Sequence, residues 1–237
     1  MPGDSKTEKA TPKKRRDERK KGNVMMSKDV VAVATLLGTL AMFKVMGGVV
    51  VEQAGNLLET CFAYIASPEA VSLSGILPKV LIKCILTFCI VAGPFLLATA
   101  LLAMTATFAQ TKLLVTGESL KPKFSRLNPL QGFKRLFSMR SVVELIKNLI
   151  KIAILLILIF RYFQGATLDF ARFLDMELGQ ACAILYDDIF ALLVQVAVAF
   201  IVVAFFDYLY QWWDYERQLR MSKQEIKEEY KQTEGDP

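Results

Sequence analysis

The longest apolar segment of this sequence runs from Cys84 to Thr111 and contains no charged residue. A helix needs about 20 mostly apolar residues to cross the hydrocarbon core of a bilayer. With 54% hydrophobic residues and a mean hydropathy of +0.37, the whole chain is typical of an integral membrane protein. Gly93 and Pro94 lie in the middle of the segment and predict a kinked helix, because proline removes one helical hydrogen bond.

Three further segments complete a prediction of four transmembrane helices, over residues 30–51, 84–111, 143–163 and 185–210. Lys44 interrupts the first of them, and the third must include Glu144, Lys147 and Lys151 to reach spanning length. The fourth ends in aromatic residues typical of a membrane interface, namely Phe205, Phe206, Tyr208, Tyr210, Trp212 and Trp213. We therefore expect an all-α integral membrane protein whose transmembrane domain covers residues 30–210.

The orientation follows from the Lys and Arg residues of the connections, which favour the cytoplasmic side. Residues 1–29 hold ten of them, residues 47–79 one, residues 112–142 seven, residues 164–183 one, and the tail from Gln211 five. This alternation predicts a basic cytoplasmic N-terminal segment (1–29), a cytoplasmic connection (112–142) and the start of a cytoplasmic linker (211–237).

The basic N-terminal segment is predicted to contain a short helix. Thr11 suits the N-cap, Pro12 the first helical position, and Gly22 the C-terminal stop. Seven of the nine residues from Lys13 to Lys21 are basic. The segment therefore fits attraction to anionic lipid, or docking on an acidic protein partner. Nucleic-acid binding is disfavoured, because no aromatic residues interleave the charges.

Two connections carry helical patterns of their own. Residues 51–65 have apolar side chains at helical spacing, which predicts a short interfacial helix. In the middle connection, Asn128 and Pro129 predict the start of a helix that ends near Phe137. Ser141 and Glu144 have the spacing of a capping box at the start of the third span. From the pattern alone, the middle helix fits either a lipid surface or a protein partner.

Lys147 and Lys151 are four residues apart, so they share one face of the predicted third span. Lys147 can reach the interface by snorkelling, but Lys151 lies about two turns inside the span. A charge at that depth is costly in contact with lipid. We therefore expect Lys151 to face a protein neighbour or a hydrated groove.

The residues give no support for a reaction chemistry. Histidine is absent, which excludes histidine-based triads, HExxH metalloprotease sites and histidine proton relays. No CxxC pair exists, so neither a zinc site nor a disulfide framework is indicated. We expect no catalytic, metal-binding or cofactor-binding residues, and we interpret as buried small apolar residues the cysteines Cys61, Cys84, Cys89 and Cys182.

Three long motifs, which together span nearly the whole chain, carry a resemblance to a known family. They are KTEKATPKKRRDERKKGNV, LKPKFSRLNPLQGFKRLFSMRSVVELIK and YERQLRMSKQEIKEEYKQTEGDP. In these motifs and their order the chain closely resembles the membrane domain of the FlhB family, the flagellar type III export switch proteins, whose injectisome relatives form the same superfamily.

The resemblance implies a fold and a function. It implies four transmembrane helices in two hairpins, in the bacterial inner membrane and the flagellar basal body. These associate with an export gate of three other membrane proteins, through which flagellar proteins are exported. The 112–142 loop would wrap the gate entrance and regulate its opening. The match identifies as gate-contacting Lys121, Pro122, Phe124, Ser125, Arg126, Leu127, Asn128, Pro129, Leu130, Phe133, Arg135 and Phe137.

The sequence also departs from the family pattern. The family's cytoplasmic domain cleaves itself at an Asn-Pro-Thr-His motif and switches substrate class, but the only Asn-Pro pair here, Asn128-Pro129, is followed by Leu and Gln. We therefore expect a non-enzymatic membrane domain without the switching segment. An ion or proton channel is the main alternative, supported by Lys151 and Gln195 but weakened by the lack of acidic residues at mid-bilayer. A membrane-anchored nucleic-acid binder using residues 13–21 is a further alternative.

Overall fold

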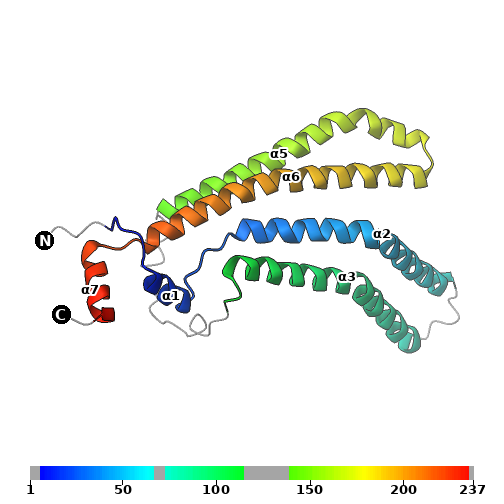
Figure 1. Ribbon diagram of the computed structural model, residues 1–237. Coiled ribbons are helices and arrows are strands. Elements are labelled where there is room, and N and C mark those ends of the chain that lie inside the picture. Colours follow the sequence, from blue (N-terminus) through cyan, green and yellow to red (C-terminus); the bar gives the residue numbers. More distant parts are fainter. Residues whose placement is uncertain (1–5, 67–72, 115–138, 235–237) are drawn as a thin grey trace. The chain divides into compact units, whose positions relative to one another are not determined.

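The computed structural model describes residues 6–66, 73–114 and 139–234 (Figure 1). In this part of the chain the named elements are all helices, which confirms the all-α prediction. In chain order they are α1 (Pro12–Lys20), α2 (Lys28–Ala66), α3 (Leu73–Thr111), α5 (Met139–Arg172), the 3-10 helix η4 (Phe173–Asp175), α6 (Leu178–Leu219) and α7 (Lys223–Glu234).

Three of the described helices, α2, α3 and α6, are long and apolar enough to cross a membrane. They contain three of the four predicted spans. The third predicted span, 143–163, lies within α5, which is not one of these three helices. Charged residues recur along α5, among them Lys147, Lys151 and Arg161. The count of four spans and their pairing as two hairpins therefore stay predictions.

Two predictions of helix boundaries are wrong. Residues 51–65 were expected to form a separate interfacial helix, but they continue α2. The helix can continue here because residues 51–65 contain no proline. Their single glycine, Gly55, destabilises a helix by only about 1 kcal/mol relative to alanine. The second wrong prediction put Ser141 at the N-cap of α5. This helix already includes Met139, so Ser141 lies inside it.

The N-terminal helix α1 has the predicted caps. Thr11 has an extended backbone and its hydroxyl accepts a hydrogen bond from the backbone N–H of Lys14 at 3.2 Å. Gly22 has a φ of 82°, a left-handed conformation that glycine adopts without strain. The residues at both ends of the basic segment therefore determine the length of α1.

One compact unit comprises Val31–Ala106, and hence most of α2 and α3. The rings of Phe43 and Phe95 lie 4.8 Å apart between their centroids. Gly38 brings the helices close together, since a Cβ atom there would lie 1.9 Å from Leu102 Cδ1. Most other apolar side chains of both helices are exposed, as a lipid-facing surface requires. Figure 1 shows that α3, which contains Pro78 and Pro94, is bent, as the predicted kink requires.

The other unit comprises Met1–Val30 and Thr107–Pro237. In it α5 lies along α6 (Figure 1). The buried residues of α6 include Ala197, Ala204, Asp207 and Asp214, whose spacing of seven, three and seven residues puts them on one face. The two alanines allow close helix packing, and the two aspartates introduce charge into the interior of this unit.

Candidate functional site

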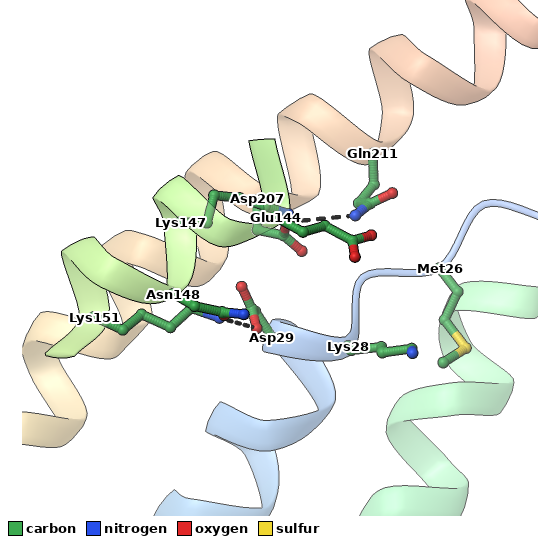
Figure 2. A pocket seen from close by; sticks show the side chains of 9 residues that line it. All are labelled: Met26, Lys28, Asp29, Glu144, Lys147, Asn148, Lys151, Asp207 and Gln211. Atoms are coloured by element: carbon green, nitrogen blue, oxygen red, sulfur yellow. Dashed lines mark hydrogen bonds and ion pairs between the residues drawn. The ribbon is translucent and has the colours of Figure 1, made fainter. Parts of the chain in front are cut away.

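The structure brings Lys147 and Lys151 to one polar site at the start of α5 (Figure 2). Lys147 forms an ion pair with Asp207 of α6. Lys151 forms a second ion pair with Asp29, in the first turn of α2, at 2.5 Å. Each lysine therefore has a carboxylate of another helix as its neighbour. Whether the two lysines lie inside the bilayer stays a prediction.

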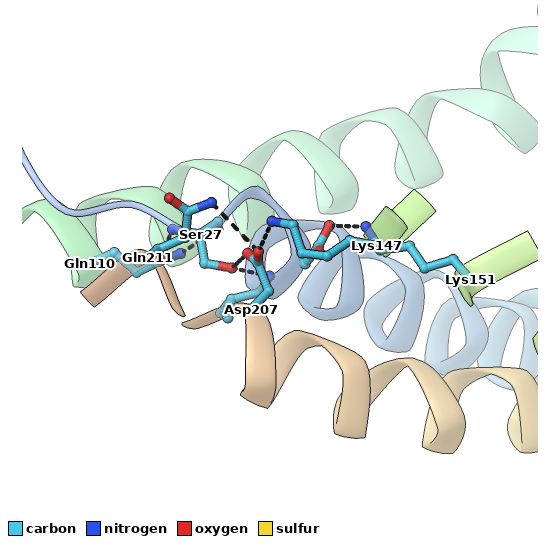
Figure 3. A network of polar contacts seen from close by, with 8 residues as sticks. Ser27, Gln110, Lys147, Lys151, Asp207 and Gln211 are labelled. Carbon is cyan, nitrogen blue, oxygen red and sulfur yellow. Dashed lines mark hydrogen bonds and ion pairs between the residues drawn. The ribbon is translucent and has the colours of Figure 1, made fainter. Parts of the chain in front are cut away.

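Asp207 is the centre of this site (Figure 3). Its side chain is only 3% exposed. Burial of a carboxylate is costly unless it is paired and hydrogen-bonded. Besides Lys147, Asp207 accepts hydrogen bonds from the Ser27 hydroxyl at 2.6 Å and from Gln211 Nε2 at 3.5 Å. The Lys147 ammonium also lies 5.2 Å from the centre of the Tyr210 ring, within the range of a cation–π interaction.

Ser27 connects this centre to two other segments. It is fully buried, and its hydroxyl accepts a hydrogen bond from the Val30 N–H at 3.2 Å, as an N-cap of α2 does. Its backbone is held by Gln110, near the end of α3. The Ser27 N–H donates to Gln110 Oε1 at 2.8 Å, and Gln110 Nε2 donates to the Ser27 carbonyl at 3.2 Å. The site therefore joins the N-terminal segment, α3, α5 and α6.

A polar cavity of about 290 Å³ lies between these side chains. Its charged lining residues are three lysines and three acids, so their formal charges cancel. Among the described residues there is no group of three or more His, Cys, Asp or Glu that could hold a metal ion. The arrangement can hold helices together and admit water. The residues shown in Figure 2 line it: Met26, Lys28, Asp29, Glu144, Lys147, Asn148, Lys151, Asp207 and Gln211.

The basic N-terminal segment docks on the acidic C-terminal part of the same chain. Arg15 donates two hydrogen bonds to Glu216, at 2.6 and 2.7 Å, in the bidentate geometry that makes such pairs strong. The Thr11 hydroxyl donates to Glu229 at 2.6 Å. Glu8 and Met221 exchange two backbone hydrogen bonds of 3.0 Å. Part of the positive charge of the N-terminal segment, which predicted binding to lipid or to an acidic partner, is therefore neutralised by acidic residues of the same chain.

Among the carboxyl groups with lowered pKa values are Glu225, in the C-terminal part, and Glu18, in α1. The pKa of Glu225 is held below its ordinary value by the Lys6 ammonium and by the backbone N–H of Ser222. The pKa of Glu18 is likewise lowered, by the Asn23 amide and the Lys21 ammonium. In both cases hydrogen bonds to the charged form stabilise it.

Arg19 holds the end of α3, where the 112–142 connection begins. Its Nη2 atom donates to the carbonyl oxygens of Thr111 and Lys112, at 3.4 and 2.7 Å. A cation at a helix C-terminus is favourable, because the last carbonyls carry partial negative charge. Lys112 and Leu113 have φ values of 54° and 56°, so the chain leaves α3 through two residues in a conformation that non-glycine residues rarely adopt.

The predicted gate-contacting residues, from Lys121 to Phe137, lie outside the described residues, as does the helix expected over 128–137. The described flanks of that connection are nevertheless informative. One flank is held by Arg19, and the other enters α5, where Lys147 meets Asp207. Asp29 and Asp207 were not among the residues predicted from the sequence. A lysine in an apolar helix was the available signal, since it requires an acidic partner elsewhere in the chain.

Comparison with known proteins identifies the relatives of this chain. The profile of the FlhB HrpN YscU SpaS family matches residues 4–237. The chain is 34% identical to the Yop proteins translocation protein U of Yersinia pestis and 34% identical to the flagellar biosynthetic protein FlhB of Bacillus subtilis, in each case over 98% of its length. It is 30% identical to the secretion system apparatus protein SsaU of Salmonella typhimurium, again over 98% of its length.

The chain spans 64% of the length of the first two of these relatives and 65% of the third. These relatives are named as a translocation protein, a flagellar biosynthetic protein and a secretion system apparatus protein. Together with the profile match, they confirm the resemblance found in the sequence motifs. The profile match covers all the elements that form the polar site and the docked N-terminal segment. The chain therefore belongs to the FlhB HrpN YscU SpaS family.

Proposed function

We propose that this chain is a membrane subunit of a type III protein export apparatus, that it associates with the export gate, and that residues 112–142 regulate opening of the gate. Family membership supports the export role. Relatives named as flagellar and as translocation proteins are equally similar, each 34% identical, so the proposal addresses the type III apparatus as a class. Proteins exported through the gate are the proposed cargo.

The observation that carries the proposal is the anchoring of both flanks of the 112–142 connection. Arg19 binds the carbonyls of Thr111 and Lys112 at its beginning, and Gln110, the residue before Thr111, is hydrogen-bonded to Ser27. Beyond the connection, Lys147 is paired with Asp207, which Ser27 also contacts. Both ends of residues 112–142 are thus attached near one polar site. A loop fixed in this way can bind a partner protein and still keep its position relative to the long helices.

We infer four transmembrane helices in two hairpins, with the third of them in α5 and both termini cytoplasmic in the bacterial inner membrane. The alternation of basic connections supports this orientation. Contacts between the segments expected in the cytoplasm support it as well. Glu8 pairs with Met221, and Arg19 contacts Lys112. The N-terminal segment therefore touches both the tail and the start of the middle connection, which is consistent with all three on one side of the bilayer.

A structural role for the two lysines is favoured over an ion or proton relay. Lys147 and Lys151 each already form an ion pair with an aspartate. Asp207 is also hydrogen-bonded by Ser27. Such satisfied pairs hold helices together, whereas a relay needs groups that exchange protons readily.

Co-purification tests the proposal. The tagged chain is extracted from native membranes in mild detergent, and the proteins that accompany it are identified. We expect the membrane proteins of the export gate. Replacing a packed phenylalanine by alanine costs about 3–5 kcal/mol in a protein site. Phe133→Ala should therefore weaken the association, and the matched control Lys134→Arg should not. Recovery of the chain without gate proteins would contradict the proposal.

A further inference from the structure

A second cavity, of about 540 Å³, lies beside the docked N-terminal helix. Four segments of one compact unit form it: α1, the residues before α2, the end of α3, and the last turns of α6. Arg15, Arg19 and Lys112 supply its positive charge, and Tyr208, Trp212 and Tyr215 supply an aromatic wall.

The positive charge of this cavity is only partly neutralised within the chain. Arg15 is paired with Glu216. Arg19 instead binds two carbonyl oxygens, which carry no formal charge, so its guanidinium stays fully cationic. Lys112 is exposed, and its ammonium forms no ion pair with the described residues. Arg19 and Lys112, which are in contact with each other, thus supply two cations of the cavity lining to an anionic ligand.

The aromatic wall suits a membrane interface. Trp212 is 53% exposed, and Tyr208 precedes it by one helical turn. Tryptophan and tyrosine are enriched at the level of the lipid headgroups, where one end of the ring is apolar and the other polar. Apolar side chains continue along α6 toward the centre of the predicted span, since Phe205 and Leu209 are 58% and 43% exposed. The cavity therefore combines a cationic part with an apolar surface suited to acyl chains.

We propose that this cavity binds the headgroup of an acidic phospholipid such as phosphatidylglycerol, with Arg19 and Lys112 at its phosphate. The proposal rests on the topology inferred under the proposed function, which puts the cavity at the cytoplasmic interface. Basic pockets between transmembrane helices on that side are suited to anionic headgroups. A bound lipid would lie at the base of the 112–142 connection, because Arg19 and Lys112 are in contact there.

Native mass spectrometry of the purified full chain in detergent tests this site. Phosphatidylglycerol, phosphatidylcholine and glycerol phosphate are titrated separately. We expect phosphatidylglycerol to be retained most strongly. A basic residue near a membrane surface contributes about a five-fold factor in affinity, so Lys112→Gln should weaken phosphatidylglycerol binding about five-fold. Arg19→Gln should weaken it at least as much, and the matched control Lys13→Gln, on the same helix but outside the cavity, should not.

Three results would overturn the proposal. Equal retention of phosphatidylglycerol and phosphatidylcholine would remove the headgroup specificity. Equal effects of Lys112→Gln and Lys13→Gln would reduce the binding to general charge attraction. Glycerol phosphate bound as tightly as the lipid would assign the site to a soluble phosphate. No gate protein is present in the experiment, so its failure is distinguishable from failure of the proposed gate association.

Discussion

Lys151 of α5 and Asp29 of α2 form an ion pair at 2.5 Å although 122 positions separate them in the sequence. The neighbouring pair, Lys147 with Asp207, joins α5 to α6. Together the two pairs attach the start of α5 to the N-terminal segment and to α6. Each charged residue of these two pairs therefore has its partner on a different helix.

The first prediction concerns the Lys147–Asp207 pair. Lys147→Leu leaves the buried Asp207 carboxylate without its cation, which costs about 3 kcal/mol at the lower end of the range for breaking a buried pair. The double variant Lys147→Leu, Asp207→Leu should recover most of this loss, because neither charge then remains. Lys28→Leu is the control, because Lys28 lines the same cavity and forms no ion pair with the part of the chain that the structure describes. Unfolding in detergent measures the difference, and equal losses in the single and double variants would contradict the pairing.

The second prediction concerns Ser27. Ser27→Ala removes both the N-cap bond to Val30 and the bond to Asp207, and should cost about 1–2 kcal/mol. Ser27→Asp keeps a capping oxygen but brings a second carboxylate against Asp207. We expect it to be less stable than Ser27→Ala, because like charges at this distance repel. Thermal unfolding at neutral pH compares the two, and an aspartate variant as stable as the parent would refute the geometry.

The third prediction concerns pH and Glu225. Its pKa lies below the ordinary 4.5 because of Lys6 and Ser222, so the stabilisation is fully present above about pH 4.5. It is lost as the pH falls through the lower pKa of the folded state. Spin labels at Lys13 and Lys227 should therefore move apart at pH values below the ordinary 4.5, as Glu225 takes up its proton. Glu225→Gln should reduce this step, and an unchanged step would exclude Glu225 as a contributor.

The fourth prediction concerns orientation. Single cysteines are introduced at four positions in a cysteine-free background and treated with a thiol reagent that cannot cross the membrane. The basic connections predict that two of the positions are protected in intact cells and that the other two react. Labelling of either protected position from outside would overturn the topology. The protected positions are Ser5 and Ser119, and the reactive ones are Ser72 and Thr167.

Local features of the fold were predictable from the sequence. Apolar runs marked the long helices. Thr11, Pro12 and Gly22 marked α1, because each acts on backbone no more than a few residues away. A capping box does occur, but at Ser222 and Glu225 rather than at the predicted Ser141. The spacing alone cannot distinguish them, since it recurs wherever serine precedes an acid by three residues.

The site was less predictable, because its contacts are between distant parts of the chain. Lys151 signalled that it needed a neighbour, but nothing local identified Asp29 as that neighbour. Likewise, the basic residues of the N-terminal segment predicted an acidic or anionic partner without indicating that Glu216 supplies part of it. Tertiary packing decides such pairings, and a pattern of 3.6 residues per turn carries no information about them.

The most direct test of the central claim is a photocrosslinking scan of residues 119–140 in native membranes. A clamp on the gate depends on shape, whereas a helix on a lipid surface depends on charge and general hydrophobicity. The account predicts that crosslinkers at Phe124 or Leu127 capture gate proteins in the closed state, and that deletion of residues 121–137 abolishes gate binding. Adducts to lipid alone, or gate binding that survives the deletion, would contradict it.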